Sequence, residues 1–405
     1  MIALSACSKD NSMFSMPDID RVKTKLAFTC AHEVNSLPPV DSHADEIFNY
    51  ARYLEKQRGE KDYNEIARYY RIAAAYDHYK ANHNLQKLVS EGWAHSPHPQ
   101  RESVELATKL VAQGIPVGYF DIGYYISRGY GFKQDQEMAL RYFRKAADLG
   151  NADAQYYVAD KLSPWNMAPD VAQKMYQCAI EQGHGEAAED WGISLQDEKQ
   201  YGQATQTFQK GVSAGSSLSA LLLKQAFGIA QSEDQLGYLD LPYDAERSHR
   251  YELIGAFLNR NDGRNPKVPD IDDIVPLPPA PLPAWDGSFQ WEKEQQVVPP
   301  KPSEDLMKRL CKDKQLDPAT GLPLPLPPKT ALGTRVKTGE ACPETGKWCV
   351  WSNGRVLPYA ASYCHKGQSM PVYEKWQPRR FGLLDGFLPF KFSYWNVEWQ
   401  LVDYS

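Results

Sequence analysis

The chain has 405 residues, of which 42% are apolar, enough for about two packed domains. Lysine and arginine number 45 against 51 acidic residues, so the net charge is −6. This sign argues against a protein that binds nucleic acid or an anionic membrane surface. The 24 tyrosines and 10 tryptophans favour recognition of another protein.

The N-terminus contains the run L-S-A-C at residues 4–7, in which an apolar and two small residues precede Cys7. This run resembles the lipobox of bacterial lipoproteins, whose cysteine is acylated. The resemblance implies that Cys7 is a lipidation site in a periplasmic protein, and Ser8 implies an anchor in the outer membrane. Only three residues precede the run, so we expect a truncated start or an internal Met1. No stretch of about 20 apolar residues follows, so we expect membrane contact only through this lipid.

Six further cysteines can pair in an oxidising periplasm, and 15 connectivities are open. Their positions are Cys30, Cys178, Cys311, Cys342, Cys349 and Cys364. Because only P-E-T-G-K-W separates Cys342 from Cys349, we expect this pair to close a small loop as a disulfide. Zinc is the rival, but the chain has no C-x-x-C and only His365 lies near these cysteines. We therefore expect no metal and no cofactor.

Residues 1–40 are predicted to form a tether with one short strand that ends at Cys30, and a helical pattern occupies residues 41–261. The clearest part is 115–150, where small and apolar residues recur twice at helical spacing around the glycine turn G-Y-G. Tyr142 and Phe143 supply area for packing against a neighbour. One hairpin of this size cannot bury its apolar face alone, so the pattern predicts a stack of such units.

The ends of successive units set the register of this stack. Placing them at Asp77, Gly114, Gly150, Gly183 and Gly215 gives spacings of 37, 36, 33 and 32 residues. Glycine at such a position is typical of a helix C-cap. About six hairpins predict a mainly α protein built as a right-handed α-solenoid of two-helix repeats.

Two motifs of the third and fourth units carry a family resemblance. A-L-R-Y-F-R-K-A-A-D-L-G at 139–150 and A-x-A-Q-Y at 152–156 resemble the Sel1-like repeat, a relative of the tetratricopeptide repeat. The resemblance implies a scaffold that binds a partner.

A more particular resemblance covers residues 27–115. The runs F-T-C-A-H-E, A-D-E-I-F-N-Y-A-R-Y-L-E-K and Y-Y-R-I-A-A-A-Y-D-H-Y-K-A-N-H-N-L-Q-K-L are similar to lipoproteins that act as immunity proteins against type VI secreted phospholipase D effectors. The resemblance implies a periplasmic protein that protects the producing cell from its cognate effector. We expect it to form a 1:1 complex with that effector and to cover the entrance to the effector's active site. The alternatives are a periplasmic scaffold or adaptor that recruits or chaperones an effector, and an envelope hydrolase.

The composition changes after residue 261. Residues 262–328 are predicted to be a proline-rich linker with one short helix, since 264–303 alone contain ten prolines. Residues 329–405 alternate apolar and polar side chains in several runs and predict a small β-rich domain around Trp348, Trp395 and Trp399.

The sequence lacks a complete catalytic motif of the classes considered. A phospholipase D site needs H-x-K-x-x-x-x-D, and the run that begins at His78 and Lys80 has Leu85 in place of the acid. G-x-S-x-G and H-E-x-x-H are also absent. We therefore predict that the chain is not an enzyme.

Two sets of residues are predicted to contact the partner. The first helix of each pair should line the concave side of the solenoid, where tyrosines and acids suit a protein interface. Equivalent positions there form one row of Asn84, Asp121, Tyr157 and Asp190 and a second row of Lys87, Tyr124 and Asp160. The other set is an acidic segment that could occupy a cationic cleft, and it comprises Asp270, Asp272, Asp273, Trp285 and Asp286.

Overall fold

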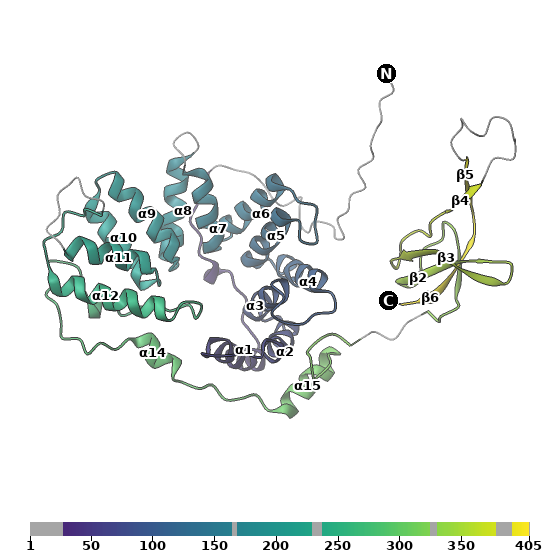
Figure 1. Cartoon of the computed structure of the whole chain (residues 1–405), viewed down its shortest axis with the longest axis horizontal. Coiled ribbons are helices and arrows are strands. Elements are labelled where there is room, and N and C mark those ends of the chain that lie inside the picture. The colour runs from purple at the N-terminus through teal and green to yellow at the C-terminus, as the bar shows by residue number, and fades with distance from the viewer. Residues whose placement is uncertain (1–26, 164–167, 229–236, 325–329, 378–390, 405) are drawn as a thin grey trace, which may run out of the picture. The chain divides into compact units, whose positions relative to one another are not determined.

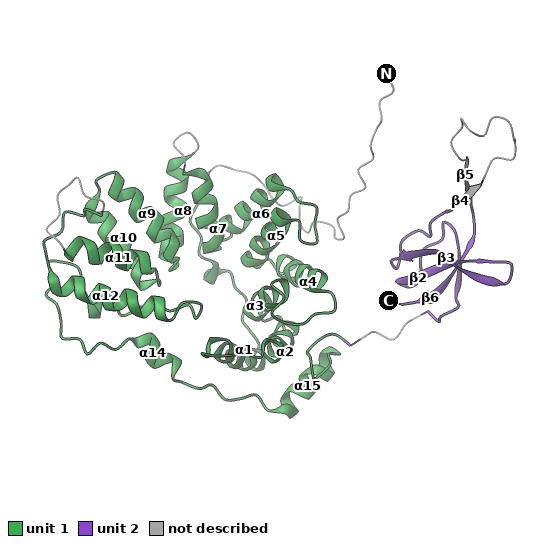
Figure 2. Cartoon of the chain, viewed as in Figure 1, with its two compact units in different colours: residues 1–323 green, residues 324–405 purple. Residues whose placement is uncertain are grey.

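The structure is a computed structural model that describes residues 27–163, 168–228, 237–324, 330–377 and 391–404. The chain divides into two compact units (Figure 2). Residues 1–323 form the helical unit and residues 324–405 form the β unit.

In the described part of the helical unit, helices α1 to α12 pack as six antiparallel pairs (Figure 1). The first three pairs are α1 (Ser42–Lys56) with α2 (Tyr63–Ala75), α3 (Tyr79–Ser90) with α4 (Pro99–Ala112), and α5 (Pro116–Arg128) with α6 (Gln136–Asp148). The others are α7 (Ala152–Leu162) with α8 (Pro169–Glu181), α9 (Gly185–Asp197) with α10 (Tyr201–Ser213), and α11 (Ser217–Gly228) with α12 (Ala245–Arg260). The predicted array of two-helix units is confirmed.

The predicted unit ends are also where the backbone turns. All five have a positive φ, from 61° at Asp77 to 104° at Gly150. A residue in this region ends a helix and frees the chain to begin the next one. Tyr142 and Phe143 are almost completely buried in the core of the central pairs, as their spacing predicts.

The two ends of the helical array meet. The Arg58 guanidinium donates to the side-chain oxygen of Asn261 at 3.1 Å, across the ends of α1 and α12. Nearby, Arg264 Nε donates to the carbonyl of Lys56 at 2.7 Å. The described helical unit therefore closes on itself, and Figure 1 shows α12 reaching toward α1.

Residues 262–323 differ from the predicted linker because they pack against the repeats; we call them the return segment. They contain α13 (Ile271–Ile274), α14 (Gln290–Gln295) and α15 (Glu304–Lys314). Ile271 and Ile274 are buried in the core of the last pairs, and Met307 is buried in the core of the first pairs. These apolar side chains favour docking of a proline-rich segment that would otherwise remain extended in solvent.

The β unit contains a four-stranded antiparallel sheet in the order β1-β6-β2-β3 and a separate pair, β4 with β5. The strands are β1 (Arg335–Lys337), β2 (Gly346–Ser352), β3 (Arg355–Cys364), β4 (Tyr373–Gln377), β5 (Lys391–Trp395) and β6 (Glu398–Asp403). Trp348 and Trp399 are buried in its core as predicted. Trp395 is 48% exposed on β5, so its predicted place in the core is wrong.

The expected disulfide between Cys342 and Cys349 is also wrong, because both are free thiols. Cys342 belongs to the core that contains Trp348 and Val350. Cys349 lies between these two residues on β2, so its side chain points to the opposite face of the sheet. A short loop therefore does not bring the two sulfurs together.

Candidate functional site

The segment 27–41 is held on the helical array by backbone and side-chain bonds, and its described residues form no strand. A short 3-10 turn, η2 (Glu33–Asn35), follows His32. The amide of Gln155 donates to the carbonyl of Ala31 at 2.8 Å, and the amide nitrogen of Glu33 donates to the carbonyl of Gly150 at 3.1 Å. The segment thus crosses the junction between α6 and α7. We call it the N-terminal segment.

Glu33 links this segment to two helix starts. Its carboxylate accepts from the backbone N–H of Val117 at 3.2 Å and from the side-chain amide of Asn151 at 3.0 Å. Helix α5 has no side-chain cap from its own N-cap residue, Ile115, so Glu33 satisfies a free N–H at a site that favours negative charge. Burial raises the pKa of Glu33, and the two hydrogen bonds oppose that rise.

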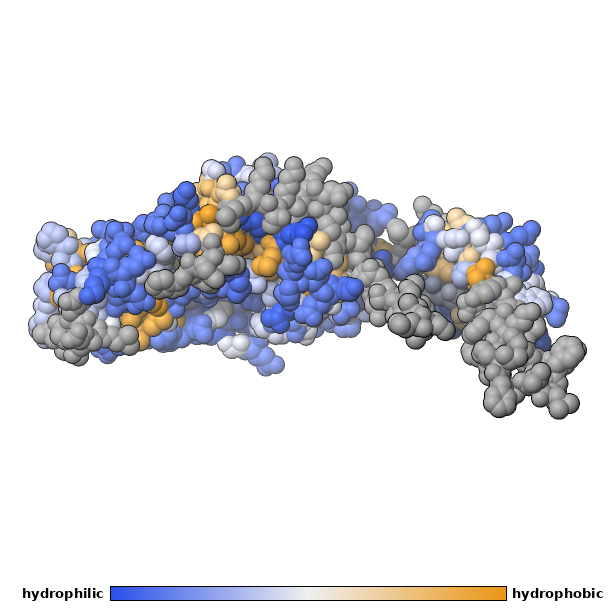
Figure 3. Space-filling view, turned by 90° about the horizontal axis from the view of Figure 1, so that it is seen from above, coloured by the Kyte–Doolittle hydropathy of each residue, from blue (hydrophilic) through white to orange (hydrophobic). Residues whose placement is uncertain are grey.

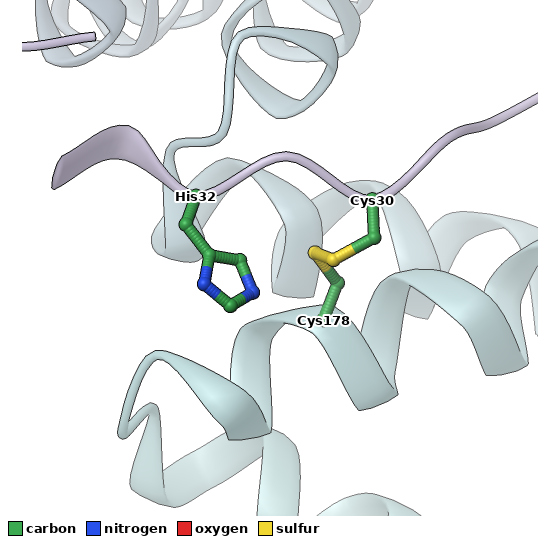
Figure 4. A group of neighbouring side chains, drawn as sticks. All are labelled: Cys30, His32 and Cys178. Atoms are coloured by element: carbon green, nitrogen blue, oxygen red, sulfur yellow. A yellow bond between two sulfur atoms is a disulfide. The ribbon is translucent and has the colours of Figure 1, made fainter. Parts of the chain in front are cut away.

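A disulfide joins the N-terminal segment to α8. It links Cys30 to Cys178, which are 148 positions apart in sequence. His32 lies beside it, and its Nε2 is 3.2 Å from a carboxylate oxygen of Glu181. Figure 4 shows the imidazole of His32 next to the two sulfur atoms, between the N-terminal segment and α8.

The N-terminal segment forms one wall of a pocket of about 460 Å³, which we call the inner pocket. This volume lies within the range of about 300–1,000 Å³ typical of ligand-binding pockets. The remaining walls come from α1, α3, the start of α5 and the start of α7. The lining residues are Glu33, Val34, Leu37, Phe48, Arg52, Tyr79, Lys80, His83, Asn84, Val117, Asn151 and Asp153.

The inner pocket carries charges of both signs. His83 Nδ1 lies 3.0 Å from the carboxylate of Asp121, whose side chain is only 9% exposed. Burial alone would lower the pKa of His83, but the charge of Asp121 and its hydrogen bond outweigh burial and raise this pKa to about 9. Arg52 pairs with Glu55, and the ammonium of Lys80 lies over the ring of Tyr79. The lining therefore offers both cationic and anionic groups to a charged side chain of a binding partner.

The structure separates the two predicted rows by their exposure. In the first row, Asn84 donates to the hydroxyl of Tyr70 at 3.2 Å, Asp121 contacts His83, and Asp190 accepts from Tyr156 at 3.0 Å. These groups therefore hold the helices together. Tyr157 of this row packs its ring against Phe143.

The second row is exposed. Tyr124 is 41% exposed, and the guanidinium of Arg128 lies 4.7 Å from the centre of its ring. The ammonium of Lys87 lies 5.7 Å from the ring of Trp93, and Asp160 accepts from Lys161. Tyrosine, tryptophan and arginine are enriched at protein interfaces, and the role of this row as a contact surface stays a prediction.

The acidic segment is anchored to the helical unit. Asp272 accepts from Gln209 of α10 at 3.0 Å, and Asp270 accepts from the backbone N–H of Gln290. Trp285 is half-buried and donates to the carbonyl of Ser288. Asp273 and Asp286 are exposed. The segment is therefore held against the helical unit, and its exposed carboxylates form an acidic edge.

The remaining candidates have structural roles or lie outside the described residues. His78 is 1% exposed and its Nδ1 accepts from the N–H of Ala81, so it caps the start of α3. Cys7 lies outside the described residues. The sequence did not predict the disulfide between Cys30 and Cys178 or the ion pair between His83 and Asp121. The residues of each pair are far apart in sequence, and no local pattern connects them.

On the face shown in Figure 3, hydrophilic residues cover most of the described surface, and apolar residues gather in small groups between them. Among the described residues, no helix has both the length and the apolar character needed to cross a bilayer.

Several solved structures are similar to the helical part of this chain. The chain is similar to immunity protein Pa5087 from Pseudomonas aeruginosa, with 26% identity over 63% of this chain and 96% of that one and a TM-score of 0.52. The chain resembles an immunity protein. It is also similar to P. aeruginosa PA5086, with 25% identity, 63% and 96% coverage and a TM-score of 0.51.

A third solved structure has a similar fold. Immunity protein PA5088 from P. aeruginosa is 22% identical, with 63% of this chain and 95% of that chain covered and a TM-score of 0.51. A family model described as "Domain of unknown function (DUF6396)" matches residues 219–324, which include most of α11, all of α12 and the return segment. No curated protein matches the chain.

Proposed function

We propose that this chain is an immunity protein that binds a cognate toxin and neutralises it. The observation that carries the proposal is the similarity to immunity protein Pa5087, which extends over 96% of that protein. The match covers 63% of the present chain, so it takes in far more than one repeat. A shared fold alone would be weak support, because helical repeats serve many partners.

The toxin we propose is a phospholipase D effector of a type VI secretion system. The resemblance of residues 27–115 to immunity proteins of this class supports the assignment. We place the protein in the periplasm, held to the outer membrane through acylated Cys7. The disulfide between Cys30 and Cys178 supports this location, because such bonds persist in oxidising compartments.

We propose two contact surfaces for the toxin. One is the exposed row of Lys87, Tyr124 and Asp160, which offers an aromatic ring between charges of both signs. The other is the acidic edge that ends at Asp273 and Asp286, whose charge suits the cationic cleft in which a phospholipase holds lipid phosphate. Together these surfaces would cover the entrance to the toxin's active site in a 1:1 complex.

Co-expression tests this function. Cells that direct a phospholipase D with two H-x-K-x-x-x-x-D motifs to the periplasm should die, and production of this protein in the same compartment should restore growth. A protein that only recruits or chaperones the effector would bind it without restoring growth. Calorimetry with the purified, catalytically inactive effector separates failure to bind from failure to protect.

A further inference from the structure

Four metal-binding side chains converge where the N-terminal segment meets α8. The two sulfurs of Cys30 and Cys178 and a ring nitrogen of His32 all lie within 4.8 Å of one another. A carboxylate oxygen of Glu181 lies 3.2 Å from His32 Nε2 and 4.0 Å from Cys30 Sγ. Figure 4 shows the first three of these residues, with the imidazole directed along the same side as the sulfurs.

Local geometry explains the convergence. Cys30 and His32 are two residues apart on an extended stretch, so their side chains point the same way. Cys178 and Glu181 are three residues apart on α8, so they share one face of that helix. The C-x-H pair and the C-x-x-E pair therefore face each other across the contact.

The distances and ligand types suit one particular cation. Zinc in proteins takes four ligands in a tetrahedron, drawn from cysteine sulfur, histidine nitrogen and carboxylate oxygen. Its bonds of about 2.0–2.3 Å place neighbouring ligand atoms about 3.3–3.8 Å apart. The separations from Glu181 to His32 and to Cys30 bracket that range. The two bonded sulfurs have to move apart, and Cys30 itself is exposed to solvent.

We propose that Cys30, His32, Cys178 and Glu181 form a zinc site when the disulfide is reduced. A dithiol reductant converts the disulfide to two thiols and is itself oxidised to a disulfide. Binding of Zn²⁺ then displaces one proton from each thiol, so two thiolates, one imidazole and one carboxylate surround the ion.

This site would keep the N-terminal segment attached in both redox states. The oxidised protein holds the segment through the S–S bond, and the reduced protein holds it through the ion. Glu33, three residues after Cys30, would then remain in place at the start of α5 and at the wall of the inner pocket. The proposed zinc site does not depend on the proposed function, because all four ligands belong to this chain and no toxin takes part in binding the ion.

Cobalt provides the spectroscopic test. The full-length protein is reduced with a phosphine, freed of metal and titrated with Co²⁺, which reports thiolate ligands through a charge-transfer band. We expect a band that saturates at about one ion per chain and disappears when Zn²⁺ is added. The same titration of the oxidised protein should give no such band.

Three variants locate the site. The double variant Cys30→Ser/Cys178→Ser should lose the band, although four other thiols remain in the described residues. His32→Ala and Glu181→Gln keep both sulfurs and should weaken Co²⁺ binding by about tenfold or more. Circular dichroism checks that each variant retains its helices. No band in the reduced protein, or an equal band in the double variant, would overturn the proposal, as would unchanged affinity in both single variants.

Discussion

Replacing Gly150 by alanine should displace the N-terminal segment around Glu33 and destabilise the helical unit. A Cβ atom at this position would lie 2.6 Å from the backbone nitrogen of Glu33 and 2.7 Å from the carbonyl carbon of His32. Both are main-chain atoms, so no flexible side chain can move aside to make room. The segment itself must shift, and the bonds that Glu33 makes would weaken or break.

The size of the effect follows from these bonds. Glu33 accepts from Val117 and Asn151 through its side chain and donates to Gly150 through its backbone. At about 0.5–1.5 kcal/mol for each hydrogen bond, their loss costs about 3 kcal/mol. Alanine at a positive φ adds about 1 kcal/mol of backbone strain. We expect a total destabilisation of about 4 kcal/mol, reduced to the extent that the segment relaxes while Cys30 keeps it tethered.

Gly183 provides a matched control. It ends the next unit with a φ of 79°, but a Cβ there would meet nothing within 4 Å. Gly183→Ala should therefore cost only the backbone strain, about 1 kcal/mol. Urea unfolding of the full chain, followed by far-ultraviolet circular dichroism, compares the two variants. Hydrogen exchange should become faster at the amide of Glu33 in Gly150→Ala alone. Equal loss of stability in both variants would refute the reasoning.

Three further variants test the fold and the contact surface. Arg71→Ala should destabilise the protein by about 3 kcal/mol or more in urea unfolding, because it leaves the carboxylate of Glu102 largely buried without its ion pair. The stability that His83 contributes should be complete below about pH 6.5 and should fall as the pH rises through 9, because its folded pKa of about 9 exceeds the unfolded value. Nuclear magnetic resonance of the His83 ring should report that pKa, and Asp121→Asn should lower it. Tyr124→Ala should weaken toxin binding by about 1 kcal/mol or more in calorimetry.

Each of these predictions has its own contrary result. Arg101→Ala removes an exposed ion pair and should change stability by less than about 1 kcal/mol, so a cost equal to that of Arg71→Ala would contradict the role of burial. A pKa of His83 at or below 6.5 would contradict the electrostatics of the inner pocket. Tyr243 is an exposed tyrosine outside the two rows, and an equal loss of affinity in Tyr243→Ala would remove the second row as the contact surface.

The repeats were predictable because their signals are local. A glycine or aspartate with positive φ at each unit end and buried aromatics such as Tyr142 follow from helix capping and helical spacing within about 36 residues. The same rules place alternating strands in the C-terminal unit. The β-core position of Trp395 was wrong because alternation alone does not say which strands join the main sheet.

Contacts between distant segments were not predictable from these rules. Cys30 and Cys178 lie 148 residues apart, and spacing offers no reason to prefer this pair. Asp121 was expected to face a partner, but its neighbour on the preceding unit, His83, neutralises it. The return segment contains short apolar runs such as that of Ile271 and Ile274, whose burial depends on a surface formed by other repeats. These long-range contacts build the inner pocket and the acidic edge.

The central claim, that this protein neutralises a toxin, is tested most directly by survival. Cells that produce a periplasm-directed phospholipase D effector with two H-x-K-x-x-x-x-D motifs are plated with and without this protein, at equal effector levels verified by immunoblot. We predict that growth is restored when the protein is present and that Tyr124→Ala lowers the protection. Death of the cells despite a normal periplasmic level of this protein would contradict the account.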